Sequence, residues 1–390
     1  MKSNRYYTTT DALAVSILAI GLGEELWQAY LPRYLMALGG SAAVVGLFGS
    51  CRDFLDSAYQ LPGGWLSDRL GARSVIRVCT AVAMVGYAVY ALSWTWPMAF
   101  VGLACAMAWK AGAFPATFAL VGDSLPSSGR VGAFTRQSLA VRLPRVCAAP
   151  LGGLLVWKLG LIGGVRAGAV VALAAGAVAL AVQRRALGVA AVDAANPPPR
   201  PCGAPRLNAH LRSLLVAECF VRVGEAIAAS FIILYVTTVR GVPVPVFGLL
   251  YALQQSVALA VYVPSARVAR VLGSRPLVAV TFLFFALFPV AVVWLPGWAG
   301  LVAAFVAGGC KEIGEPARKA SIVDACRADA RGREVGTYYA IRNLAVVPGG
   351  LLGGLLWPRS PVLVLELAGA VSFAGFLIFL KGRDFGRRGW

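Results

Sequence analysis

Charged residues are scarce in this chain of 390 residues. They make up 14% of the sequence, whereas a soluble domain of ordinary composition has about 25%, and 59% of the residues are hydrophobic. A polytopic membrane protein requires this composition, because each membrane-spanning helix needs about 20 apolar residues. We therefore expect the chain to cross a membrane many times.

Metal-binding and catalytic patterns are scarce as well. The single histidine, His210, lies in a polar stretch, and the eight cysteines show no C-x-x-C spacing. We find no metal-ligand cluster, no nucleophile elbow and no phosphate-binding glycine loop, so we expect no metal, no bound cofactor and no enzymatic activity. The first eleven residues are polar and no small-residue cleavage site follows them, so we expect no cleavable signal peptide.

Twelve apolar segments follow one another along the chain, six on each side of a break that is rich in proline. We expect an N-terminal six-helix bundle at 1–183, a cytoplasmic linker at 184–210 and a C-terminal six-helix bundle at 211–390. The apolar segments are 12–37, 42–65, 74–95, 98–122, 131–157, 160–183, 211–239, 244–266, 276–296, 298–323, 334–357 and 361–381.

The formal charge of +19 sits mostly in short loops on alternate sides of these segments. The positive-inside rule then places both termini and the linker in the cytoplasm, and we expect a multi-pass protein of the cell membrane. Because the basic residues specify topology, the charge implies no nucleic-acid partner. The bilayer and a small-molecule substrate are the expected partners, and we expect a monomer.

The two halves repeat each other. Lys110-x-x-x-x-Pro115-Ala116 matches Lys311-x-x-x-x-Pro316-Ala317 at an offset of 201 residues, and Gly23-Glu24 matches Gly224-Glu225 at the same offset. A series of matches in register across several segments indicates duplication, with two parallel halves related by an axis along the membrane normal.

A short charged stretch separates the second and third apolar segments. It reads Gly64-Trp65-Leu66-Ser67-Asp68-Arg69-Leu70-Gly71-Ala72-Arg73, and we expect it to form a glycine-bounded loop. The pattern resembles the signature loop of the major facilitator superfamily of secondary transporters. The resemblance implies an all-α fold of twelve transmembrane helices in two pseudo-symmetric bundles. It also implies a conformational gate formed by Gly64, Asp68, Arg69, Gly71 and Arg73. The second copy has lost the aspartate, because Arg270 stands in its place.

Ionisable groups at mid-span depth are functional candidates, because each costs several kcal/mol unless it is paired or wet. Charged acids in the first half suit a proton site, since a carboxylate near a cation can be switched by protonation. A structural ion-pair cluster without a transport role is the alternative. The candidate proton carriers are Glu24, Glu25, Asp53 and Asp56.

The resemblance also implies that spans 1, 4, 7 and 10 line a central cavity, with spans 2, 5, 8 and 11 at its sides. Most mid-span charges fall on these eight spans. We expect an i, i+4 ladder of Lys311, Glu315 and Lys319, with Arg318 and Lys319 on a solvated face. The candidate cavity residues are Gln28, Arg52, Lys110, Arg142, Arg145, Arg222, Glu225, Gln254, Gln255, Lys311, Glu312, Glu315, Arg342 and Asn343.

The predicted function is secondary active transport by alternating access. The preferred hypothesis is proton-coupled export of amphipathic small molecules. It rests on a weak resemblance of Ala149-Pro150-Leu151-Gly152-Gly153 to the drug/proton antiporter branch. One alternative is transport of organic anions or anionic lipid headgroups, which unpaired lysines and arginines would favour. A second alternative is a sensor that keeps the fold and no longer transports.

Overall fold

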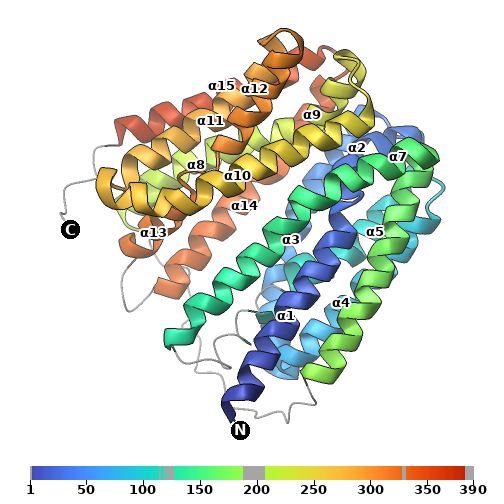
Figure 1. Cartoon of the computed structure of the whole chain (residues 1–390). Coiled ribbons are helices and arrows are strands. Elements are labelled where there is room, and N and C mark those ends of the chain that lie inside the picture. The colour runs from blue at the N-terminus through green and yellow to red at the C-terminus, as the bar shows by residue number, and fades with distance from the viewer. Residues whose placement is uncertain are drawn as a thin grey trace. The chain divides into compact units, whose positions relative to one another are not determined.

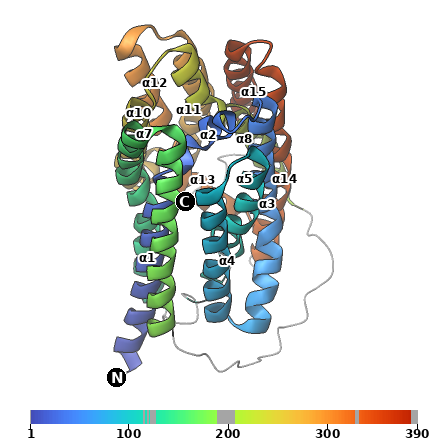
Figure 2. The same cartoon turned by 90° about the vertical axis from the view of Figure 1, so that its right-hand side faces the viewer.

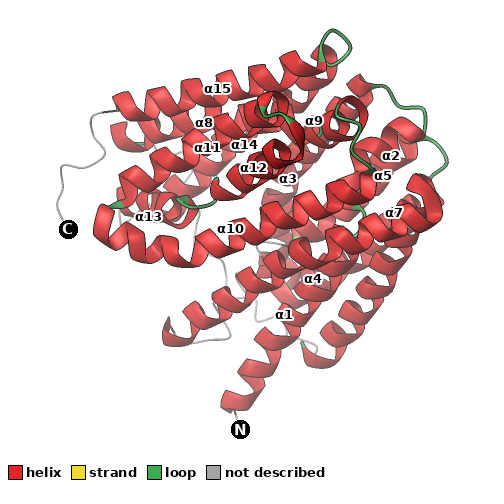
Figure 3. Ribbon diagram, turned by 45° about the horizontal axis from the view of Figure 1, so that its top comes forward, coloured by secondary structure: helices red, strands yellow, loops and turns green. Residues whose placement is uncertain are grey.

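The computed structural model describes residues 2–113, 116–117, 120, 127–187, 207–326 and 331–382. Most of the predicted linker therefore lies outside the described residues. Helices and short loops make up the described part, and Figure 3 shows no strand in it. Each of the twelve predicted spans overlaps a helix of the structure.

Eight helices in the described residues are long and apolar enough to cross a membrane. One of them, Ala140–Ala186, has 47 residues, too many for a single crossing. It belongs to α7 (Ser127–Ala186), in which Gly160 has a φ of 72° and divides the helix into two arms. The all-α multi-pass fold predicted from the sequence is confirmed.

The chain contacts itself as two compact units, with boundaries that cut through two helices. Unit 1 is 1–40, 54–200 and 243–249; unit 2 is 41–53, 201–242 and 250–390. The first part of α3 (Ala42–Leu70) thus belongs to unit 2, and the first part of α10 (Val244–Leu272) to unit 1. The predicted bundle boundaries stay a prediction.

Unit 1 is built on α1 (Lys2–Glu25), which packs along α7 (Figures 1 and 2). At their crossing, a Cβ added to Gly23 would lie 2.5 Å from the Cα of Ala172. Small residues at such crossings let helix backbones approach, which is how helices associate inside a membrane. The other elements are η1 (Gln28–Tyr30), α2 (Leu31–Ala37), α4 (Ala72–Leu92), α5 (Trp96–Met107) and the π-helical turn η2 (Ala108–Gly112).

Unit 2 has α8 (Ala209–Ala229) at its centre, packed against α11 (Ser274–Trp294), α14 (Arg331–Leu356) and α15 (Pro361–Lys381) (Figure 1). A Cβ on Gly375 of α15 would lie 2.6 Å from the carbonyl oxygen of Ala217 on α8. The remaining elements are α9 (Phe231–Leu234), the π-helical turn η3 (Tyr235–Val239), α12 (Gly297–Cys310) and α13 (Glu315–Ala325).

Within unit 2, the first part of α3 meets α14 through glycines. A Cβ on Gly350 would lie 2.7 Å from the carbonyl oxygen of Gly46, and one on Gly354 would lie 3.1 Å from its Cα. The Ser50 hydroxyl accepts a hydrogen bond of 2.9 Å from the backbone N–H of Leu351. This contact of backbone on backbone leaves no room for a side chain.

In the charged stretch 64–73, the loop is shorter than the sequence predicts. α3 continues as a helix to Leu70 and α4 begins at Ala72, so Gly71 is the single residue between them. Its φ of 79° is a conformation that favours glycine, and Gly273 makes the equivalent turn in unit 2 with a φ of 82°. The predicted glycine-bounded loop is thus reduced to Gly71, because one glycine suffices to reverse the chain.

Candidate functional site

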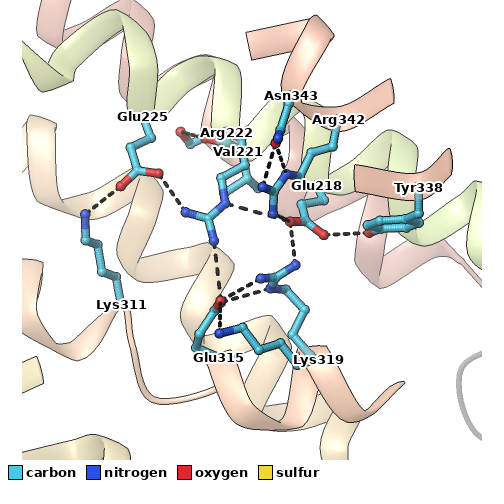
Figure 4. A network of polar contacts seen from close by, with 12 residues as sticks. Glu218, Val221, Arg222, Glu225, Lys311, Glu315, Lys319, Tyr338, Arg342 and Asn343 are labelled. Atoms are coloured by element: carbon cyan, nitrogen blue, oxygen red, sulfur yellow. Dashed lines mark hydrogen bonds and ion pairs between the residues drawn. The ribbon is translucent and has the colours of Figure 1, made fainter. Parts of the chain in front are cut away.

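The buried ionisable residues of unit 2 form one network of hydrogen bonds and ion pairs, drawn in Figure 4. Its centre is Glu218 on α8, whose side chain is fully buried. The carboxylate accepts hydrogen bonds of 2.5 Å from Arg318 on α13, 3.1 Å from Arg342 on α14 and 2.5 Å from the hydroxyl of Tyr338. Three helices are therefore tied together through a single carboxylate.

Glu315 and Glu225 extend this network in two directions. Glu315 receives two hydrogen bonds from Arg318, of 2.9 and 2.6 Å, and a longer one of 3.4 Å from Arg222. Arg222 also donates to Glu225 at 2.8 Å, and Lys311 donates to the other oxygen of Glu225 at 2.7 Å. Each carboxylate of the network is thus neutralised by at least two cationic side chains.

The helix that should carry Lys311 and Glu315 is interrupted between them. α12 ends at Cys310, α13 begins at Glu315, and residues 311–314 form turns. The Thr281 hydroxyl of α11 accepts a 2.6 Å hydrogen bond from the backbone N–H of Gly314 and so satisfies one group that the break leaves free. In span 4, the π-helical turn η2 interrupts the helix at the equivalent residue, Lys110.

This interruption removes the Lys311–Glu315 pair of the predicted ladder, whereas its Glu315–Lys319 pair is confirmed at 3.6 Å. Lys311 contacts Glu225 on α8, whereas Glu315 pairs with Arg318, Arg222 and Lys319. The prediction that Arg318 is solvated was also wrong, because only 2% of its side chain is exposed; that of Lys319 is 53% exposed. The i, i+4 spacing assumed a continuous helix, which the turn at 311–314 removes.

Unit 1 holds a second polar cluster around the end of α1. Glu24 is 7% exposed, and its carboxylate accepts a 2.7 Å hydrogen bond from the Tyr87 hydroxyl on α4. Among the described residues, no lysine or arginine lies within ion-pair distance of Glu24. Its neighbour Glu25 points elsewhere and pairs with Arg145 on α7 at 3.2 Å.

One turn further on, Gln28 accepts a 3.3 Å hydrogen bond from Lys110 of the π-helical turn. Lys110 is exposed although it lies midway along a span, so its ammonium group faces an open space in the structure. Trp27 is buried between these groups, with its ring centroid 4.5 Å from that of Tyr90. The cluster thus combines a buried carboxyl that forms no ion pair among the described residues with a nearby lysine that is hydrogen-bonded to a neutral amide.

The remaining predicted site residues differ in their contacts. Arg52 and Asp53 form a mutual ion pair of 3.6 Å. Gln254 is buried and donates to the carbonyl oxygen of Gly308 on α12. Asp56, Arg142, Gln255 and Glu312 are partly buried, and Asn343 accepts two hydrogen bonds from Arg342. The surroundings of Gly64 and of the Asp68 side chain lie outside what the structure describes. Arg69 packs on the Trp65 ring.

Sequence reasoning left out four residues that carry these clusters: Glu218, Arg318, Tyr338 and Tyr87. The i, i+4 spacing of Glu218 and Arg222 was a usable signal for the first of them. Arg318 has a local partner in Glu315, but its other partner, Glu218, is 100 residues away in the chain, and no local spacing indicates that pair. Among the described residues, no group of three or more His, Cys, Asp or Glu side chains is placed to hold a metal ion.

The fold and the buried polar clusters define a helical membrane protein with two polar centres at mid-span depth. A family model described as Major Facilitator Superfamily matches residues 12–213 and again 214–388. The chain belongs to the major facilitator superfamily. It is accordingly a multi-pass membrane transporter rather than an enzyme.

Solved structures of transporters share this fold at low sequence identity. A crystal structure of the nucleoside transporter NupG is 14% identical, with a TM-score of 0.78 over 96% of this chain and 100% of that one. A POT family transporter in complex with a thioalcohol-conjugated peptide is 12% identical, with a TM-score of 0.78 over 95% of each chain.

A bacterial homologue of the iron transporter ferroportin, in an inward-facing state, is 13% identical, with a TM-score of 0.74 over 96% of this chain and 98% of that one. No match was found among curated proteins. At these identities the likeness establishes the fold alone.

Proposed function

We propose that this chain is a proton-coupled secondary transporter that works by alternating access and exports amphipathic small molecules. It would act as a monomer in the cell membrane with both termini in the cytoplasm, and the proton gradient would supply its energy. The acids of span 1 would carry the proton, and the surrounding polar side chains would bind the cargo.

The observation that carries the proposal is the environment of Glu24. The carboxyl is buried, a hydroxyl donates to it, and no described cation forms an ion pair with it. A carboxyl inside a membrane span that forms no ion pair gains more from neutralisation than one held between arginines. Glu24 is therefore the acid best suited to take up and release a proton during transport.

The acids of unit 2 have the opposite character. Glu218, Glu225 and Glu315 each contact two or more arginine or lysine side chains, so protonating any of them would break buried ion pairs. The pairing also occupies Arg222, Lys311 and Arg342, which disfavours an anionic cargo at these residues. This contrast supports a proton carrier in unit 1 and an amphipathic cargo.

A second candidate, transport of an organic anion or an anionic lipid headgroup, is favoured by Lys110. This exposed lysine is hydrogen-bonded to the neutral amide of Gln28, so its charge stays available to an incoming anion. Ionic cargo bound there would lie near Glu24, which lies at the end of α1, four residues before Gln28 in the chain.

The test is thermal unfolding of the detergent-purified protein against ethidium, fluorescein and glycerol 3-phosphate, each at pH 5.5 and pH 7.5. A ligand that binds only the folded protein stabilises it by RT ln(1 + [L]/Kd), or about 2.7 kcal/mol at 100 Kd. We expect ethidium to stabilise the protein at pH 7.5 and less at pH 5.5, because a proton and a cation compete for the same carboxyl.

Glu24→Gln is the decisive variant, because it keeps the size of the side chain and removes its titration. It should abolish the difference between the two pH values, whereas Glu366→Gln should not. Glu366 accepts a hydrogen bond from Trp294 and lies in the first turns of α15, which belongs to unit 2. Stabilisation by fluorescein that grows at pH 5.5 would favour the second candidate and contradict the first.

A further inference from the structure

Unit 1 contains an apolar cavity that neither polar cluster uses. It has a volume of about 190 Å³ and is lined by residues of α3, α4 and η2: Tyr59, Pro62, Gly63, Trp65, Leu66, Cys79, Ala108 and Gly112. The cavity is open at the surface, where Pro62 and Trp65 are exposed, and a space of this size and apolar lining suits part of a hydrocarbon chain. Water is the less favourable occupant.

One arginine lies at the edge of this cavity, and a second follows four residues later in the chain. The guanidinium of Arg69 lies over the Trp65 ring at 4.0 Å from its centroid, and Arg73 follows across the Gly71 turn. Within the described side chains, no Asp or Glu forms an ion pair with Arg69 or Arg73. A guanidinium that lies over a ring still has N–H groups that can donate to a phosphate.

The depth of the cavity matches one leaflet of a bilayer. Tyr59 lies eleven residues before Leu70, the last residue of α3, which corresponds to about 16 Å of helix. Half of the hydrocarbon core is about 15 Å thick. The cavity thus extends from beneath the arginines to about the acyl depth of the leaflet that the positive-inside rule makes cytoplasmic.

We propose that this cavity and its arginines bind a resident anionic phospholipid. One acyl chain fills the cavity between α3, α4 and η2, and the phosphate lies against Arg69 and Arg73. The lipid is structural and not cargo, so this inference does not depend on the proposed function. Because Ala108 and Gly112 belong to the π-helical turn that carries Lys110, the acyl chain would also support that turn.

The experiment is native mass spectrometry of the full-length protein titrated with lipids that share the same dioleoyl chains. We expect phosphatidylglycerol to bind with a higher affinity than phosphatidylcholine, and glycerol 3-phosphate alone not to compete with it. Equal affinities for the two lipids would overturn the role of the arginines. Competition by glycerol 3-phosphate would show a plain anion site and overturn the role of the cavity.

Two double variants locate the site. Each arginine near a membrane surface contributes about fivefold to anionic lipid binding, so Arg69→Gln with Arg73→Gln should lower the preference for phosphatidylglycerol roughly 25-fold. The control is Arg184→Gln with Arg185→Gln, in the last turn of α7, which removes the same charge from a helix that contributes no residue to the cavity lining. An equal loss in both variants would mean that net charge, rather than this site, selects the lipid.

Cys79→Leu tests the cavity itself, because it places two further heavy atoms into the space that the acyl chain would fill. It should lower the affinities for both lipids and keep their ratio. Unchanged affinities, in a variant that melts as the wild type does without lipid, would contradict occupation of the cavity.

Discussion

Glu218 offers the sharpest test of the network in unit 2. The variant Glu218→Gln keeps the shape of the side chain and removes the charge that Arg318 and Arg342 contact. Arg318 is almost fully buried and would retain Glu315 alone as its acidic partner. Removing one partner of a buried ion pair costs about 3–5 kcal/mol, because the other charge stays buried without compensation.

The matched control is Glu225→Gln, on the same helix and in the same network. The side chain of Glu225 is 29% exposed, so in the variant water can take over part of the hydrogen bonding that the carboxylate provides. We expect a loss of about 1 kcal/mol there, in the range of ordinary hydrogen bonds and accessible ion pairs. Unfolding in detergent, followed by tryptophan fluorescence against increasing sodium dodecyl sulfate, measures both variants.

A double-mutant cycle with Arg318→Met completes the argument. If the penalty of Glu218→Gln arises from an unpaired buried guanidinium, removing that guanidinium as well should recover a large part of it. The reasoning would be refuted if Glu218→Gln and Glu225→Gln lost the same stability, or if the two changes at 218 and 318 were simply additive.

Three further predictions concern the backbone contacts. Gly350→Val should push α3 away from α14 and lengthen spin-label distances between the two helices. Gly336→Val, on the same helix, should not, because a Cβ at Gly336 meets nothing within 4 Å. Equal distances in both variants would contradict the close packing. Gly71→Ala should cost roughly 1–3 kcal/mol of unfolding free energy because of its φ of 79°, and a variant as stable as Gly336→Ala would show that the turn is not strained. Tyr30→Phe removes a 2.6 Å hydrogen bond to the carbonyl oxygen of Ala149 and should cost about 1 kcal/mol in the same unfolding assay; no loss would mean that the hydroxyl is equally well solvated elsewhere.

The sequence predicts the helices well because their signals are local. Apolar runs of sufficient length locate the spans, and Gly71 and Gly273 mark turns that favour glycine. The repeat at an offset of 201 residues also marks the two places where a span is interrupted, but it does not indicate the form of the interruption. Lys110 lies in a π-helical turn and Lys311 at a break between two helices, so equivalent residues interrupt equivalent spans in different ways.

The partners of the buried charges are not predictable from the sequence in the same way. Helical spacing assigns Lys311 to Glu315, but a turn of four residues redirects Lys311 to Glu225 on another helix. Arg318 looks like a surface residue because its sequence neighbours are polar, yet Glu218 on α8 buries it. Tyr87 carries no signal at all, since an aromatic residue in an apolar run is ordinary. Tertiary contacts decide these cases.

Transport in proteoliposomes tests the central claim of proton coupling through Glu24 most directly. Ethidium accumulation is followed under an imposed pH gradient, with and without a protonophore, for the wild type, Glu24→Gln and Glu366→Gln. We predict accumulation that collapses with the protonophore in the wild type and in Glu366→Gln, and no gradient-driven accumulation in Glu24→Gln. Gradient-driven accumulation by Glu24→Gln at the rate of the wild type would contradict the account.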